Sequence, residues 1–231
     1  DDRAVAAARA EGERLGFSIE ERTAELIDDA LPLLEDVSGE RLRSELYLIL
    51  EEAEPESILG RLAEIGGLAH LSANLSYTSQ TAEMFARLRQ RFSAFEALQG
   101  APCAEGQMEH PSLPLCYLAL LTSSMDADDL ASFTQRLRIT QRDTRFLQEV
   151  ASLRDRLGEL STEAILPSRV YRLLEPYSRE ARFVISVLAD SDIVRERLDL
   201  FDRKLSLVEP HIDGHASVSY THLTLPTKRI V

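Results

Sequence analysis

The 231-residue chain has no tryptophan, only two cysteines, and few glycines and prolines, ten and nine. Cys103 and Cys116 are too few for a disulfide framework, so we expect two idle thiols in a reducing, cytoplasmic environment. No apolar run reaches the roughly 18 residues that a membrane-spanning helix needs, and we therefore expect no membrane partner. His110 has no partner at ligand spacing, and the sequence accordingly predicts no metal site.

Leucine, alanine, glutamate and arginine dominate the composition, and apolar residues recur with the 3.6-residue period of helices. Residues 78–98 place Phe85, Leu88 and Phe92 on one such stripe, which we interpret as core and not as a base-stacking platform. Residues 113–124 are apolar nearly all round, as in a central buried helix. The sequence predicts an all-α fold: a multi-helix array of about ten helices with a disordered or irregular C-terminal tail.

The most informative stretch is residues 15–67, which has the pattern of three successive amphipathic helices. Ser38 stands where a helix N-cap is needed, and Glu40 lies in the first turn, where a carboxylate suits the helix dipole. Pro55 opens the third helix at a position where a missing N–H does no harm, and Gly66 follows that helix. These signals predict helix starts at residues 39 and 55.

Three segments of this stretch, LGFSIEERTAELI, PLLEDVSGERLRSELYLIL and ILGRLAEIGGLAHL, occur in the order typical of one family. Together they resemble the neck of the bacterial CCA-adding tRNA nucleotidyltransferase and poly(A) polymerase family. The likeness continues more loosely to Gly214. The positions that carry the neck motif are Leu15, Gly16, Phe17, Ser38, Glu40, Arg41, Glu45 and Leu46.

The resemblance implies a division of the chain into four parts. Residues 1–98 would form a neck-like helical domain on the RNA and nucleotide side, and residues 99–111 a linker loop. Residues 112–214 would form a helical body and tail region that binds RNA. Residues 215–231 are interpreted as a non-native tail, because residues 217–231 lose the helical period and resemble the translated read-through of a sequencing adapter.

In the family, a helix before the neck carries an acidic pair and an arginine that read the Watson–Crick edge of the incoming ATP or CTP. Asp1 and Asp2 match the acidic pair and are the candidate nucleotide-binding residues, whereas Val5 stands at the arginine position. The alternative interpretation of this segment is a frayed, alanine-rich terminal helix.

The net charge of −13 opposes nucleic-acid binding on average, but the charge is unevenly placed. Residues 1–66 hold 18 acidic residues against 7 arginines, whereas residues 131–182 hold 10 arginines against 7 acidic residues. The resemblance implies that helices of the later segment hold tRNA phosphates. The alternative is a solvated helix face on which acidic residues such as Asp143, Glu149 and Asp155 pair with the arginines. The candidate RNA-binding residues are Arg136, Arg138, Arg142, Arg145, Arg169, Arg172, Arg179 and Arg182.

The family's catalytic head, a Gly-rich turn with paired aspartates that hold Mg²⁺, has no counterpart in the sequence. Asp126 and Asp128 have the spacing of such a pair but stand at a predicted helix start, so we interpret Asp126 as a cap. We therefore expect no catalytic residue and no cofactor in this chain, and a missing N-terminal head as its partner. Mg²⁺ with ATP and CTP is implied for the full-length parent only.

Two functions follow from these observations. The chain is expected to be the RNA-binding portion of a template-independent RNA 3′-end nucleotidyltransferase, whose parent adds CCA or A to tRNA. The alternative, which the acidity favours, is a non-catalytic helical scaffold or protein-interaction module.

Overall fold

The computed structural model describes residues 26–27, 29–99, 112–162 and 164–207. Within these ranges the chain forms eleven α-helices, α3 to α13, and two 3₁₀ helices, and it contains no strand. The all-α prediction is confirmed, with one helix more than the ten or so expected. The predicted irregular tail and the linker at residues 99–111 lie almost wholly outside the described residues, and the division into domains stays a prediction.

The helices fall into two consecutive groups. The first comprises η1 (Leu31–Glu35), α3 (Gly39–Leu50), α4 (Pro55–Glu64), α5 (Gly67–Leu71) and α6 (Ser79–Gln99). The second comprises α7 (Leu113–Leu121), α8 (Ala127–Arg136), α9 (Gln141–Asp155), α10 (Leu157–Leu160), α11 (Pro167–Leu174), α12 (Arg179–Leu188), α13 (Asp192–Arg203) and η2 (Leu205–Leu207).

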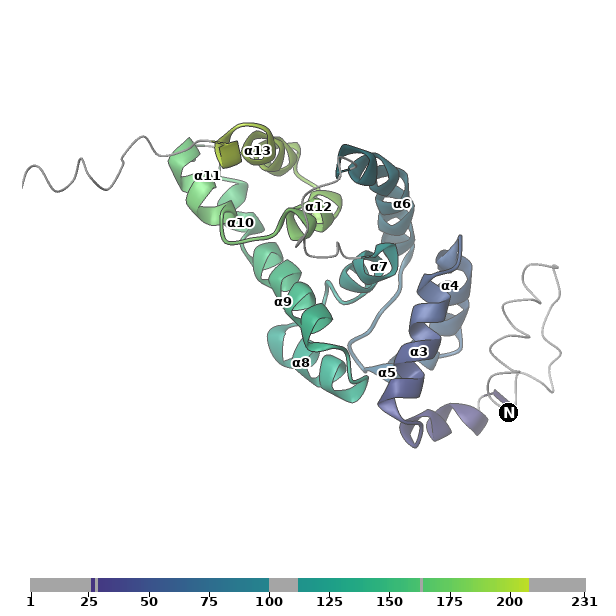
Figure 1. Ribbon diagram of the computed structural model, residues 1–231. Helices are drawn as coiled ribbons and strands as arrows, with labels where there is room; N and C mark the ends of the chain where they lie inside the picture. Colours follow the sequence, from purple (N-terminus) through teal and green to yellow (C-terminus); the bar gives the residue numbers. More distant parts are fainter. Residues whose placement is uncertain (1–25, 28, 100–111, 163, 208–231) are drawn as a thin grey trace, which may run out of the picture.

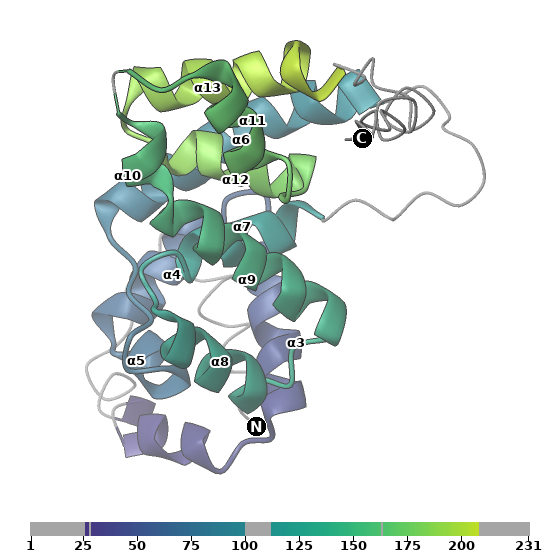
Figure 2. The same cartoon turned by 90° about the vertical axis from the view of Figure 1, so that its left-hand side faces the viewer.

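The array is elongated, with η1 at one end and α13 at the other (Figure 2). Helices α7 and α12 lie in its middle, between α6 on one side and α9 on the other (Figure 1). This arrangement leaves the outer side of α9 uncovered, and Figure 2 views the molecule from that side.

The core forms around α7, as its composition predicts. Every side chain from Leu115 to Leu121 is buried, because other helices cover this helix on all sides. The helix ends at Leu121, three residues earlier than the apolar pattern suggested, and the hydroxyl of the C-cap Thr122 donates to the Leu118 carbonyl at 2.9 Å. Phe85 of α6 is fully buried and stacks on Tyr117 with ring centroids 4.4 Å apart, so the aromatic stripe belongs to the core.

The predicted helix starts are confirmed by their hydrogen bonds. Ser38 accepts from the Arg41 N–H at 3.4 Å, and Asp126 accepts from the Asp129 N–H at 2.8 Å, which makes Asp126 a cap. Pro55 occupies the first turn of α4. The third neck helix ends as predicted, since α4 stops at Glu64 and Gly66 adopts a left-handed φ of 74° before the short helix α5 begins.

A polar cluster joins α4, α6 and α7 beside this core. Arg89 donates to Glu56 Oε2 at 3.0 Å and to the Tyr117 hydroxyl at 3.3 Å. The neighbouring Tyr77 hydroxyl is buried and makes no hydrogen bond within the described residues. Burial, followed by the charge of Glu56, raises the pKa of Tyr77 to about 12.

Replacing Tyr77 with phenylalanine is expected to raise the free energy of unfolding by about 1 kcal/mol at pH 7, because it removes an unsatisfied buried donor. The raised pKa means that the folded state favours the neutral phenol. Below pH 10 the phenol is neutral in both the folded and the unfolded state, and the shift has no cost. As the pH rises from 10 to 12, the unfolded state loses its proton first, and the free energy of unfolding falls. Urea unfolding at pH 7 and pH 11 should therefore show a smaller decrease in the free energy of unfolding at pH 11 for Tyr77→Phe than for the unmodified chain.

The control is Tyr117→Phe, which loses a bond from Arg89 and should be destabilised at pH 7. Equal behaviour of the two variants would refute this account.

Candidate nucleic-acid interface

Arg136, at the C-terminal end of α8, is turned toward the neck. Its guanidinium donates to the carbonyls of Leu34 at 3.0 Å and of Glu35 and Val37 at 3.1 Å. Carbonyls at the end of a short helix have no partner within the helix, and a guanidinium fork supplies several donors at once. Arg136 thus joins the η1–α3 turn to α8, and its guanidinium N–H groups are already bonded to carbonyls of the protein.

Arg138 lies at the same junction. Its φ is 49°, and the Ile139 N–H returns to the Thr134 carbonyl at 2.9 Å, which closes α8 with a Schellman motif. The Arg138 side chain pairs with Glu40 at 3.0 Å, and its carbonyl accepts a bond from Arg43. The ion pair is exposed and therefore weak, so Arg138 remains accessible to a ligand.

Arg182 lies inside the fold. Its side chain is 9% exposed, and it pairs with Asp202 at 2.7 Å. The guanidinium also bonds the Tyr177 carbonyl and lies 4.6 Å from the centre of the Phe201 ring. The structure gives Arg182 a packing role between α12 and α13, and it does not contribute to the surface.

Two acidic residues of α9, Asp143 and Glu149, are half-buried and directed away from its outer side. Asp143 accepts a bond from the Tyr47 hydroxyl at 3.4 Å, and burial followed by the Asp143 charge raises the pKa of Tyr47. Glu149 accepts a bond from the Ser178 N–H. The outer side from residue 141 to 152 therefore presents exposed cationic and neutral side chains and no exposed acid. We call this surface the α9 strip; it consists of Gln141, Arg142, Arg145, Gln148 and Ser152.

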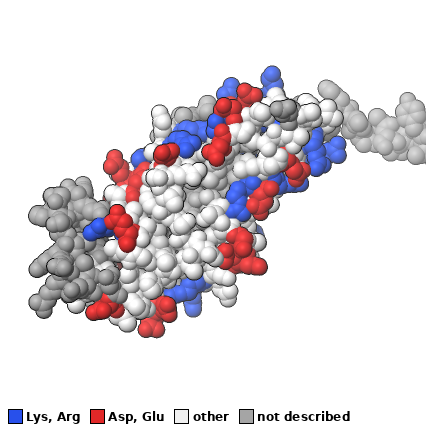
Figure 3. All heavy atoms as spheres, turned by 180° about the vertical axis from the view of Figure 1, so that it is seen from behind, with Lys and Arg blue, Asp and Glu red and all other residues white. Residues whose placement is uncertain are grey.

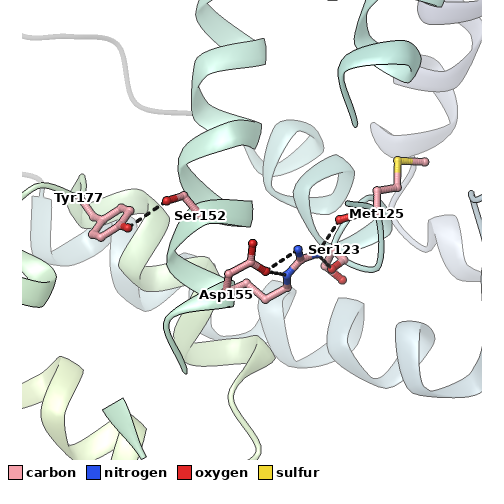
Figure 4. Close-up of polar contacts among 6 residues, drawn as sticks. Ser123, Met125, Ser152, Asp155 and Tyr177 are labelled. Carbon is pink, nitrogen blue, oxygen red and sulfur yellow. Dashed lines mark hydrogen bonds and ion pairs between the residues drawn. The ribbon is translucent and has the colours of Figure 1, made fainter. Parts of the chain in front are cut away.

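The α9 strip continues onto the connection between α11 and α12. The hydroxyls of Ser152 and Tyr177 lie 3.0 Å apart, and the Tyr177 ring points toward α9 (Figure 4). Arg179 is exposed at the start of α12, two residues beyond Tyr177. Arg169 and Arg172 are exposed on α11, where Arg169 pairs with Glu159 at 2.9 Å. The structure thus brings Arg142, Arg145 and Arg179 onto neighbouring helices.

The face of the molecule seen from behind in Figure 3 differs from the α9 strip in its distribution of charge. There, basic and acidic side chains are interspersed, with no broad area of one sign (Figure 3). Exposed pairs such as Arg87 with Glu83 and Arg61 with Glu64 are of the ordinary surface kind. The absence of exposed acid along the α9 strip is therefore a local feature.

Comparison with known proteins finds relatives of two kinds, a family model and a curated enzyme. The family described as "Probable RNA and SrmB-binding site of polymerase A" matches residues 16–76. An A-adding tRNA nucleotidyltransferase from Geobacter sulfurreducens is 27% identical over 210 residues, which are 87% of this chain and 23% of that protein. The chain is thus similar to the polymerase A family over residues 16–76, and to this A-adding tRNA nucleotidyltransferase over most of its own length.

Several solved structures share the fold of this chain. A CCA-adding enzyme in complex with ATP has a TM-score of 0.67 at 22% identity, over 96% of this chain and 51% of that one. A structure described as tRNA-processing enzyme complex 3 has a TM-score of 0.62 at 20% identity, over 95% of this chain and 57% of that one. The chain thus spans between a quarter and just over half of the length of these nucleotidyltransferase relatives.

The family's neck motif occupies the start of α3. Ser38 caps the helix and Glu40 contacts Arg138 of the body. Arg41 is exposed and Glu45 half-buried, and their side chains contact no charged partner within the described residues. The predicted nucleotide-binding residues Asp1 and Asp2 lie outside the described residues, so their role stays a prediction.

The described part of the chain holds no group of three or more histidines, cysteines, aspartates or glutamates that could bind a metal ion. None of its described helices is long and apolar enough to cross a membrane. Cys116 is buried in α7, and burial raises the pKa of its thiol to about 12, so the thiol is unreactive at neutral pH.

Sequence reasoning missed Gln148, Ser152 and Tyr177. The first two could have been found, because they follow Arg145 at the three- and four-residue spacing of one helix face. Tyr177 could not, because only the packing of α12 against α9 brings it to Ser152.

Proposed function

We propose that this chain is the RNA-binding helical portion of a template-independent RNA 3′-end nucleotidyltransferase, and that its ligand is tRNA. The full-length parent adds CCA or A to tRNA 3′ ends. ATP, CTP and Mg²⁺ are then bound by a catalytic head, which is the partner of this helical portion. The observation that carries the proposal is the α9 strip, on which arginines are exposed while the nearby Asp143 and Glu149 side chains are directed inward.

The strip resolves the conflict with the net charge of −13. Phosphate binding depends on the charges within about one Debye length, roughly 10 Å at 0.1 M salt, and not on the sum over the molecule. Arg142 and Arg145 are one helical turn apart on α9, and Arg179 is exposed at the start of α12, which packs against α9. These three arginines form a local cationic surface suited to a phosphate backbone.

The test is the salt dependence of tRNA binding, measured by filter binding from about 50 mM to 200 mM salt. Replacing Arg142 and Arg145 together with glutamine should weaken binding about tenfold at low salt and reduce the salt slope by about two. The matched control is Arg61→Gln/Arg87→Gln, which removes the same charge from exposed arginines on α4 and α6.

The control should bind as the unmodified chain does. Unchanged affinity in Arg142→Gln/Arg145→Gln would exclude the α9 strip as the RNA-binding surface. A complete lack of tRNA binding by the unmodified chain would refute the proposed function and favour the acidic scaffold.

A further inference from the structure

We infer that Ser152 and Tyr177 make the α9 strip selective for double-stranded RNA over DNA, by binding a ribose 2′-hydroxyl in the minor groove. This inference rests on the proposed function and adds to it the structural form of nucleic acid and the residues that distinguish it. It follows from the order of side chains along α9, the chemistry of the two hydroxyls and the contacts that hold Tyr177 in place.

The order of side chains along the outer side of α9 places a cation on either side of two neutral hydrogen-bonding groups. Arg145 is followed on the outer side by Gln148 and Ser152, and Arg156, which pairs with the exposed Glu159 at 3.4 Å, caps the C-terminal end of the helix. Eleven residues of helix separate the two arginines, about 16 Å along the axis. An A-form minor groove is wide and shallow, and it shows 2′-hydroxyls flanked by two phosphate backbones. The pattern of charge, neutral centre and charge matches this groove.

The hydroxyl pair has the hydrogen-bonding capacity of a 2′-hydroxyl recognition site. With the Ser152 and Tyr177 oxygens 3.0 Å apart, one hydroxyl donates to the other. The accepting hydroxyl then keeps its own proton to donate, and the donating one keeps lone pairs to accept. A 2′-hydroxyl both donates and accepts, so it satisfies both groups, and deoxyribose leaves them without this partner.

Tyr177 is held in position before any ligand binds. Its carbonyl accepts a bond from the buried Arg182, and its own N–H donates to the Leu174 carbonyl at 3.1 Å. A hydrogen bond from Arg156 to the Tyr177 hydroxyl raises the pKa of the Arg156 guanidinium. The side chain therefore loses little conformational freedom on binding, which favours selectivity.

The acidic residue at the end of the strip does not oppose an RNA backbone as a bare charge. Asp155 is paired with Arg154 at 2.6 Å, and Arg154 also donates to the Met125 carbonyl at 2.8 Å and to the Ser123 carbonyl (Figure 4). This guanidinium thus anchors the α7–α8 connection and places a positive charge beside the carboxylate next to the proposed groove.

The experiment compares three fluorescein-labelled probes by anisotropy at about 50 mM salt: a 16-base-pair RNA hairpin, a DNA hairpin of the same sequence, and single-stranded RNA. The unmodified chain should bind the RNA hairpin about tenfold more tightly than the DNA hairpin. Ser152→Ala/Tyr177→Phe should lose this preference, with DNA affinity unchanged. The control Ser132→Ala, which removes an exposed hydroxyl bonded to its own helix α8, should keep the preference.

The outcomes separate this inference from the proposed function. Equal, Arg145-dependent binding of the RNA and DNA hairpins would overturn the selectivity and leave the RNA-binding function standing. Tighter binding of single-stranded RNA than of the hairpin would overturn groove recognition alone. Failure of all three probes would overturn both. Thermal unfolding of each variant verifies that a lost preference does not reflect an unfolded chain.

Discussion

Alanine in place of Gly39 is expected to lower the free energy of unfolding by about 3 kcal/mol, the effect of overpacking a rigid contact. A Cβ added at Gly39 would lie 1.9 Å from the Arg136 carbonyl oxygen and 3.2 Å from the Leu137 Cα. Both are backbone atoms at the end of α8, so no side chain can rotate away and the two helices must separate. The loss is expected although alanine is the better helix former.

For a chain of this size, a loss of about 3 kcal/mol corresponds to a decrease in Tm of about 6–12 °C, measurable by circular dichroism. Gly158→Ala is the matched control. Gly158 lies in the short helix α10, and a Cβ there meets nothing within 4 Å. Alanine at residue 158 should stabilise the chain by about 0.5–1 kcal/mol through helix propensity. Effects of the same sign in the two variants would show that α3 and α8 are not in contact through Gly39.

The same junction shows what the sequence could predict and what it could not. Helix starts follow from short-range chemistry, and the caps at Ser38 and Asp126 lie where the sequence placed them. The burial of α7 follows from its apolar composition. The contact of Gly39 with Arg136 depends on which helix ends meet, and residues nearly 100 positions apart carry no local signal of that meeting.

The arginines illustrate this limit most clearly. Short helices leave many carbonyls without partners, and a guanidinium on a long side chain can reach them from another element. A count of basic residues along residues 131–182 therefore overestimates the charge available to RNA, since Arg136, Arg154 and Arg182 of that segment bind carbonyls within the protein. Seven arginines of the described chain donate to backbone carbonyls in this way: Arg43, Arg91, Arg136, Arg154, Arg182, Arg195 and Arg197.

Arg182→Met is expected to destabilise the chain by about 3 kcal/mol, comparable to the loss of one partner of a buried ion pair. Methionine keeps much of the packing on Phe201 but leaves the Asp202 carboxylate and the Tyr177 carbonyl without their donor. Urea unfolding followed by circular dichroism measures the change. Because the penalty comes from the unpaired carboxylate, Arg182→Met/Asp202→Leu should recover most of the stability, since replacing both partners with apolar residues is often neutral.

Arg179→Met provides the control, because Arg179 is exposed and lies one helical turn before Arg182 on α12. A surface substitution of this kind should change the free energy of unfolding by less than about 1 kcal/mol. If Arg182→Met and Arg179→Met unfold at the same urea concentration, Arg182 is not a packing residue. It would then return to the set of arginines available to RNA. A large loss that the double variant reverses assigns Arg182 to the fold, and with it the support of Tyr177 beside the α9 strip.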